Sequence, residues 1–443
     1  MNGKGLNDNL DRFLTHLDSI KDTLPMTMLL LKPHQKKATV KFQDFLKNNV
    51  DEIEDEEGEK SISIKYEDSK IFETLSKNFE ISDLASKIIP ESLFVSLISQ
   101  YDAFLNKLLR ELFKIRPEYI NQSERELTFS ELVKFKSIED AKEYIIEKEI
   151  ESILRKNHIE QFDYLEKKIN IPLRKNLPIW KTFIEITQRR NLFVHCDGIV
   201  SSQYLKICKE NNCEIGETKL NERLGIKLPY FISAYKCLYE LTTKLTHTIW
   251  RKLLPDDIKN ADRSLNDICF DLLSAEHFKL ADILLEFGCN QKNHFNDALK
   301  NVFVINQSLS KYLQKDKEKA KVIIDSKDWS ASSDDFKLAH LVLTEDFENC
   351  YKLMTKIGNN GEVDKENYKT WPLFSELRKE TKFKDTYKSI FEEDYTVLEI
   401  PKRPVQELID DLTIKNPELK SKTVKKELSD KQIRDKKETN EVK

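Results

Sequence analysis

A chain of 443 residues is too long to form one compact core, so we expect two or three separately packed units. The 9 glycines and 12 prolines, against 34% charged residues, are too little turn material for an all-β fold and favour long helices in an all-α protein. The formal net charge of −4 excludes a uniformly basic nucleic-acid coat, so any contact with nucleic acid must come from a local basic patch.

The N-terminal segment, residues 1–78, has the weakest periodicity. Residues 10–24 predict one helix, and two stretches of alternating apolar residues follow at 38–42 (ATVKF) and 61–66 (SISIKY). An acidic run, DEIEDEEGE, lies between these stretches at 51–59. We therefore predict a small β-hairpin with a solvated acidic loop in this segment.

Residues 79–254 show strong helical periodicity. Apolar residues step by three and four through 91–113 and again through 230–250, which predicts two long helices with continuous buried stripes. Shorter helical patterns occupy 129–154, 158–169 and a segment that begins after Pro178. We predict a bundle of four or more helices. The two stripes comprise Phe94, Ile98, Tyr101, Leu105, Leu108 and Leu112, and Phe231, Ala234, Leu238, Leu241 and Leu245.

Residues 255–400 contain an internal similarity. The segments 272–288 and 342–358 each read as the end of a helix, a polar turn and a second amphipathic helix closed by glycine, and Gly288 and Gly358 lie 70 residues apart. This offset is twice roughly 35 residues, so the pattern resembles tetratricopeptide-like repeats. We predict stacked helical hairpins with a groove for a protein partner; a packing domain without a ligand is the alternative. Residues 401–443 carry mixed charges and few large apolar residues, so we expect a disordered tail, or at most a lone solvated helix.

The cysteines and the apolar runs bear on location and cofactors. Seven cysteines without a C-x-x-C pair predict reduced thiols in a cytoplasmic protein. Cys208 and Cys213 have no second pair of metal ligands nearby in the sequence, so we expect neither a metal nor another cofactor. The longest apolar run, MTMLLL at 26–31, is far too short to cross a bilayer, and we expect no membrane contact.

The segment EITQRRNLFVHCDGIVSSQYL, residues 185–205, gathers polar residues at the end of a predicted helix. Asn191 and His195 are four residues apart and share a helix face, whereas Arg190 lies roughly 140° from His195 and must reach back with its long side chain. Seven basic and two acidic residues lie between 166 and 195, which favours an anionic ligand. We expect Gly198 to let the chain bend after the helix.

The sequence RNLFVHCDGIVSSQYL, residues 190–205, resembles the mark of the HEPN superfamily of helical bundles: arginine, a polar residue, three or more residues and histidine. Residues 96–113 are similar to the long early helix of that family, so the resemblance covers roughly residues 80–254. Arg189 is a second arginine at a tolerated spacing, and the asparagine neighbour favours Arg190.

The resemblance implies a metal-independent endoribonuclease in which the ribose 2′-hydroxyl attacks its own phosphodiester and leaves a 2′,3′-cyclic phosphate. Arg190, Asn191 and His195 would be catalytic, and the nearby basic residues Arg189, Arg174, Lys175 and Lys181 would bind RNA. One histidine per chain implies a homodimer through the bundle, and a role as a bacterial toxin or phage-defence effector follows by analogy.

Two other interpretations remain open. A non-catalytic HEPN-like protein could dimerise and act as a scaffold that binds a partner or a nucleotide. Alternatively, His195 could be an ordinary residue at a helix end, with Arg189 and Arg190 as surface charges near the helix C-terminus, where cations are favoured.

Overall fold

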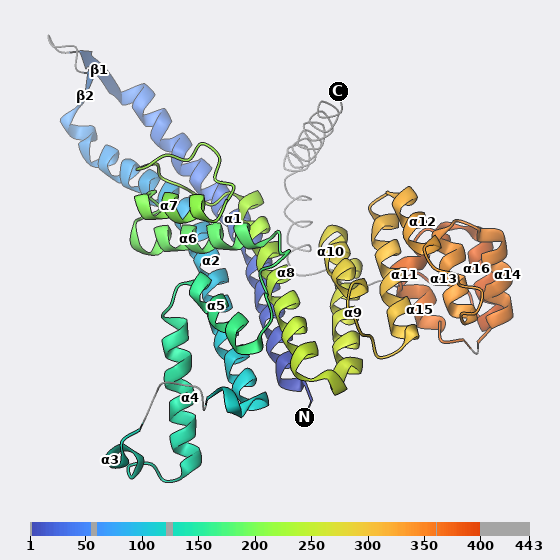
Figure 1. Ribbon diagram of the computed structural model, residues 1–443. Coiled ribbons are helices and arrows are strands. Elements are labelled where there is room, and N and C mark those ends of the chain that lie inside the picture. The colour runs from blue at the N-terminus through green and yellow to red at the C-terminus, as the bar shows by residue number, and fades with distance from the viewer. Residues whose placement is uncertain (1, 55–59, 121–126, 360, 399–443) are drawn as a thin grey trace. The chain divides into compact units, whose positions relative to one another are not determined.

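The computed structural model describes residues 2–54, 60–120, 127–359 and 361–398 (Figure 1). The described residues are mostly helical, which confirms the all-α prediction, and their strands form one two-stranded antiparallel hairpin. The tail expected at 401–443 lies outside the described residues. The chain divides into two compact units: a larger unit that contains residues 1–17, 97–224 and 229–399, and a smaller unit that contains residues 18–96 and 225–228.

The smaller unit is a helical hairpin with a short β-hairpin at its tip (Figure 1). It contains most of α1 (Lys4–Asn49) and the first part of α2 (Ser69–Ile115), joined through β1 (Val50–Glu54), β2 (Lys60–Ile64) and η1 (Tyr66–Asp68). The Phe42 ring lies 5.4 Å from that of Phe79, and the Gln35 amide donates a hydrogen bond of 3.1 Å to the Ser86 hydroxyl. The two helices therefore pack side by side.

The β-hairpin prediction was right in kind but wrong in the position of its first strand. Residues 38–42 belong to α1. Strand β1, in which Val50 pairs with Ile64, contains residues 51–54 of the acidic run that we expected to form the loop, and the rest of that run, 55–59, lies outside the described residues. The second strand, at 60–64, agrees with the prediction. An alternation of only five residues also fits a helix when its aromatic residues meet a neighbouring helix, and Phe42 and Phe45 both pack against Phe72 of α2.

The larger unit begins with a helical bundle. Both predicted apolar stripes are buried, one in α2 and one in α8. Tyr101 of α2 and Phe162 of α5 lie 5.0 Å and 6.0 Å from the ring of Phe183 in α6. The elements are α2, which passes residue 78 without interruption, η2 (Pro117–Tyr119), α3 (Phe129–Leu132), α4 (Ile138–Leu154), α5 (His158–Ile169), α6 (Trp180–His195), α7 (Ser202–Glu210) and α8 (Leu228–Leu253).

Helix pairs follow the bundle within the same unit. The similarity between 272–288 and 342–358 corresponds to α9 with α10 and α13 with α14, and α11 with α12 forms a pair between them. The elements are η3 (Pro255–Asp257), α9 (Ile258–Ser274), α10 (Phe278–Cys289), α11 (Asp297–Leu313), α12 (Lys317–Asp325), α13 (Asp334–Leu343), α14 (Phe347–Ile357), α15 (Lys365–Thr370), η4 (Pro372–Phe374), η5 (Leu377–Lys379) and α16 (Thr381–Phe391).

The same turn joins the helices of each pair. A left-handed residue closes each first helix, with φ of 60° at Glu276, 69° at Lys315 and 60° at Glu345. The next residue donates its backbone N–H across the turn, as in a Schellman motif, in the bonds His277 to Leu272 (2.8 Å), Asp316 to Lys311 (3.0 Å) and Asp346 to Leu341 (2.9 Å). A repeated backbone geometry therefore underlies the internal similarity of the sequence.

Gly288 and Gly358, which end the two similar segments, differ in role. Gly358 follows α14 with φ of 60°, as expected for a glycine that closes a helix. Gly288 lies inside α10, where a Cβ atom would come within 2.6 Å of the Phe303 ring. The expectation of helix closure was wrong for Gly288, because this glycine serves the close approach of α11.

In the part of the chain that the structure describes, every helix is too short or too polar to cross a bilayer.

Substitutions at Phe45 and Val40 test the helical assignment of residues 38–42. Phe45 is buried against Phe72, so Phe45→Ala should destabilise the helical hairpin by about 3 kcal/mol. Val40 is 44% exposed, and Val40→Ala should leave stability unchanged or raise it by about 0.5 kcal/mol, because alanine has the higher helix propensity. Hydrogen exchange of the amides in residues 30–49 measures both effects. If residues 38–42 formed a strand, loss of the β-branched Val40 would weaken it and its amides would exchange faster. Faster exchange in Val40→Ala would therefore contradict the helical assignment.

Candidate functional site

The predicted motif occupies the last two turns of α6, and the end of this helix is fixed by its surroundings. The backbone N–H groups of Cys196 and Gly198 both donate to the Leu192 carbonyl, at 2.8 Å and 3.0 Å. Gly198 has φ of 76°, and a Cβ atom there would lie 3.0 Å from the Leu224 carbonyl oxygen. The bend expected at Gly198 is therefore confirmed, and it requires glycine.

The chain after the bend is held against a second segment. Val200 donates its N–H to the Glu222 carbonyl, and Leu224 donates to the Gly198 carbonyl, each at 2.9 Å. An apolar cluster lies beneath this pairing and includes Leu192 of α6. The other buried members are Val200, Tyr204, Cys208 and Leu224. Packed side chains and backbone hydrogen bonds consequently hold the last turn of α6 in place.

Glu185, one helical turn before Arg189, is a buried carboxylate that binds three side chains. It is 5% exposed, and the Tyr204 hydroxyl donates to its Oε1 at 2.7 Å. The Tyr230 hydroxyl donates to Oε2 at 2.6 Å, and Arg189 Nε donates to Oε1 at 2.7 Å. Burial, followed by the charge of Glu185, raises the pKa of both tyrosine hydroxyls, so both remain donors at neutral pH. The network joins α6, α7 and α8.

Arg189 and Arg190 have different surroundings although they are neighbours in the sequence. The Arg189 guanidinium is bound to Glu185 and lies 4.0 Å from the centroid of the Tyr230 ring. Arg190 Nη1 donates to Asn191 Oδ1 at 3.2 Å, and its buried Nε has no hydrogen-bond partner among the described residues. No carboxylate of the described residues pairs with Arg190. Arg189 is therefore engaged within the fold, whereas the charge of Arg190 is uncompensated.

His195 is the last residue of α6, and its side chain is exposed. Asn191 is half-buried and lies one turn earlier on the same helix face. The structure joins Arg190 to Asn191 by a hydrogen bond, while no hydrogen bond among the described residues links His195 to either. The imidazole is thus open to a ligand from solvent.

The predicted RNA-binding residues differ in their availability. Arg174 forms ion pairs of 2.5 Å with Asp163 and with Glu166, and the hydrogen bond to Glu166 raises its pKa. Lys181 pairs with the exposed Glu214. Lys175 is exposed and has no ion-pair partner in the described ranges. Arg189 is paired with Glu185. Of the four predicted RNA-binding residues, Lys175 is thus the one whose charge no carboxylate of the described residues neutralises.

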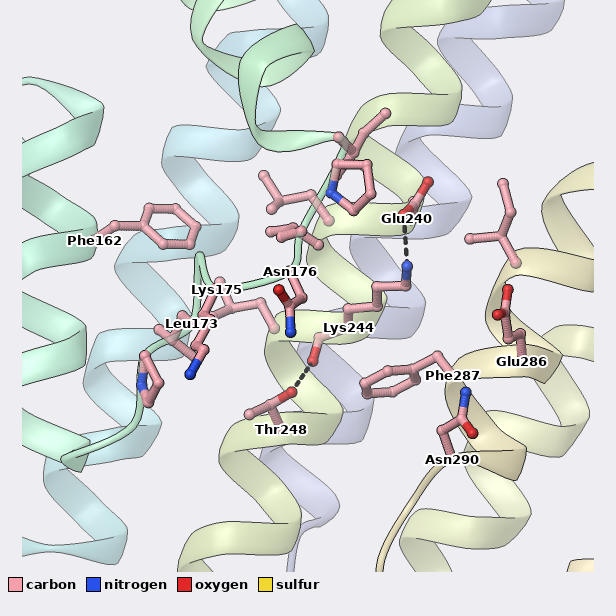
Figure 2. A pocket seen from close by; sticks show the side chains of 17 residues that line it. Phe162, Leu173, Lys175, Asn176, Glu240, Lys244, Thr248, Glu286, Phe287 and Asn290 are labelled. Atoms are coloured by element: carbon pink, nitrogen blue, oxygen red, sulfur yellow. Dashed lines mark hydrogen bonds and ion pairs between the residues drawn. The ribbon is translucent and has the colours of Figure 1, made fainter. Parts of the chain in front are cut away.

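Lys175 lines a pocket of about 670 Å³ between the segment 172–179, α8 and α10 (Figure 2). Figure 2 shows Lys175 and Asn176 on one side, Phe287 and Asn290 on the other, and α8 between them. On α8, the Lys244 ammonium donates to Glu240 Oε1 at 2.6 Å. The motif residues Arg190, Asn191 and His195 are not among its lining residues. Sequence reasoning missed this pocket, because its walls come from segments far apart in the chain.

The described residues contain no group of three or more histidine, cysteine, aspartate or glutamate side chains placed to hold a metal ion. The Cys213 N–H donates a hydrogen bond to the Cys208 carbonyl at 2.8 Å. Cys208 belongs to the apolar cluster, and Cys213 packs against it. Apolar surroundings suit structural thiols.

No protein-family model, curated protein or solved structure matches this chain.

The two arginines can be separated by their effect on stability. Arg189→Met should cost about 3 kcal/mol, because it leaves the Glu185 carboxylate buried without its cationic partner. Arg190→Met should cost less than about 1 kcal/mol, because no carboxylate depends on Arg190. Chemical denaturation of both variants provides the measurement, and the double variant Glu185→Gln with Arg189→Met should recover part of the loss. Equal losses in the two single variants would refute the distinction.

Proposed function

We propose that this protein is a metal-independent endoribonuclease of HEPN type, in which Arg190, Asn191 and His195 act on one RNA phosphodiester. The observation that carries the proposal is the contrast between two adjacent arginines. Arg189 is bound by a buried carboxylate, whereas Arg190, among the described residues, has an amide oxygen as its partner and precedes an exposed histidine by five residues on the same helix. An uncompensated guanidinium and an accessible imidazole at the same end of α6 suit a phosphodiester.

The reaction would use these groups as follows. The ribose 2′-oxygen loses its proton and forms a bond to phosphorus, while the bond from phosphorus to the 5′-oxygen breaks and that oxygen gains a proton. His195 would transfer one of these protons, and Arg190 would neutralise the extra negative charge on phosphorus. The Asn191 amide, bound to Arg190, would orient the guanidinium. The products are a 2′,3′-cyclic phosphate and a 5′-hydroxyl.

A homodimer is part of the proposal, because one histidine per chain serves both proton transfers poorly. Two exposed apolar residues, Val194 (44% exposed) and Ile199 (43%), lie close to His195 in the sequence. These two side chains are candidates for a surface that a partner would cover. A two-fold dimer over this surface would bring two copies of the motif together. We further propose that the enzyme acts in the cytoplasm as a bacterial toxin or phage-defence effector.

A non-catalytic scaffold is the second candidate, and a specific observation favours it. Arg174 and Lys181, expected to bind RNA, are both paired with carboxylates, and the pocket beside Lys175 does not include the motif. A bundle of this kind could dimerise and present the helix pairs to a partner without cleaving RNA. Assays of RNA cleavage and of dimerisation separate the two candidates.

Replacement of His195 tests the catalytic role. We expect His195→Ala to lower the rate of RNA cleavage in EDTA by at least about 10²-fold, because it removes a proton-transfer group. Its free energy of unfolding should change by less than about 1 kcal/mol, since the side chain is exposed. Labelled total RNA and detection of cyclic-phosphate ends provide the readout, and His34→Ala, at another exposed histidine, is the matched control. Full activity in His195→Ala, or no cleavage by dimeric wild type, would reject the ribonuclease proposal.

Mixing inactive variants tests the homodimer. In a shared site, adding excess His195→Ala protein to wild type should poison cleavage in proportion to the fraction of mixed dimers. Mixing Arg190→Ala with His195→Ala protein should restore part of the activity if the surviving side chains complement each other. Light scattering gives the oligomeric state in the same samples. A monomer that cleaves at full rate without poisoning would show that each chain holds a complete site.

A further inference from the structure

A second groove, of about 610 Å³, lies on the last helix pair, α13 and α14, and on the segment 327–330 that precedes them. The apolar lining residues are Trp329, Leu341 and Leu353. Four lysines also line the groove: Lys327, Lys337, Lys352 and Lys356. The groove has none of the motif residues and is independent of the ribonuclease proposal.

The charges around this groove are unbalanced. Lys337 and Lys356 share one carboxylate, that of Asp334, at 3.9 Å and 2.8 Å. Lys352 donates to the Asn349 amide oxygen at 3.3 Å, and Lys327 donates to the Asn301 amide oxygen. An amide oxygen carries no formal charge, so it accepts a hydrogen bond from an ammonium group without neutralising it. Lys327 and Lys352 thus have no carboxylate partner among the described residues.

The acidic and imidazole groups at the groove are already used by the fold. Asp328 accepts hydrogen bonds from the N–H (2.8 Å) and the hydroxyl (3.0 Å) of Ser330, and these bonds lower its pKa. His340 lies 2.9 Å from the Asp325 carboxylate. These carboxylates stay charged, but the four lysines of the groove outnumber Asp325, Asp328 and Asp334, so a small positive excess remains in a chain whose formal net charge is −4.

The apolar floor distinguishes between anionic partners. Single-stranded nucleic acid binds proteins by stacking its bases on exposed aromatic rings. Trp329, the aromatic residue of the groove, is only 5% exposed, and its indole N–H donates to the Ile324 carbonyl at 2.7 Å. The half-buried Leu341 and Leu353 instead offer a floor for aliphatic side chains.

We propose that this groove binds an acidic peptide segment of a partner protein, whose carboxylates pair with Lys327 and Lys352 and whose aliphatic side chain packs on Leu341 and Leu353. A carboxylate would replace a neutral amide oxygen as the partner of each ammonium group, which gives a stronger, charge-assisted hydrogen bond. Lys337 and Lys356, which share a single carboxylate, would pair with further acidic residues at the rim.

Fluorescence anisotropy with the full-length protein and labelled nonapeptide pools tests this proposal. The first pool carries aspartate or glutamate at six positions and leucine, isoleucine or valine at three. A second pool replaces each acid by its amide, a third replaces each aliphatic residue by serine, and a nine-nucleotide oligothymidylate represents nucleic acid. We expect the acidic and aliphatic pool to bind at least about tenfold more tightly than any other probe.

Two protein variants locate the binding. Lys352→Glu should weaken the acidic and aliphatic pool at least about tenfold, because it places a repulsive charge in the groove. Lys384→Glu, at an exposed lysine of α16 outside the groove, makes the same charge change and should weaken binding less than about twofold. Circular dichroism checks that both variants are folded, and Lys352→Gln provides a milder replacement if Lys352→Glu is not.

Three results would overturn the proposal. The first is no binding of the acidic and aliphatic pool up to about 1 mM. The second is an equal loss in Lys352→Glu and Lys384→Glu, which would show non-specific attraction. The third is tighter binding of the oligothymidylate with a loss in Lys352→Glu, which would make the groove a nucleic-acid site. RNA cleavage by the wild type bears on none of these results, so the two proposals fail separately.

Discussion

The candidate site depends on the hydrogen bonds and the ion pair that the buried Glu185 carboxylate forms. A charge removed from water is costly unless several donors satisfy it, and here Tyr204, Tyr230 and Arg189 do so. These donors come from α6, α7 and α8, so the network fixes how the three helices meet. It also fixes the rotation of α6 about its axis. Because Glu185 and Arg189 face the interior, the polar residues that follow reach the surface.

This constraint gives two neighbouring arginines different properties. Arg189 lies four residues after Glu185 and forms the ion pair, whereas Arg190 points about 100° away around the helix and has Asn191 as its partner. One arginine therefore stabilises the fold, and the other retains a charge that a phosphate could neutralise. The same contrast separates Arg174, held between Asp163 and Glu166, from the exposed Lys175. Local basic composition is a poor guide to free charge in a protein this rich in carboxylates.

The C-terminal helix pairs show how a repeated turn builds a binding surface. The turn at Glu345 sets α13 against α14, and Lys337 and Leu341 on the first helix then face a groove with Leu353 and Lys356 on the second. The preceding pair contributes Asn301 of α11, which binds Lys327 of the segment between the pairs. A positive groove consequently forms from residues that are dispersed in an acidic chain.

The sequence by itself determined residues 91–113 of α2 and the long helix α8, because a buried stripe at helical spacing has one compatible geometry over many turns. It also determined the bend at Gly198, where φ is positive and a Cβ atom would meet the Leu224 carbonyl. Tertiary structure decided whether residues 38–42 are helix or strand. Five alternating residues fit both, and the contacts of Phe42 and Phe45 with Phe72 of α2 favour the helix. It also decided which cations are free. The partner of a charged side chain depends on distances between segments remote in sequence, as for Arg189 with Tyr230 or Lys327 with Asn301, and no local pattern encodes those distances.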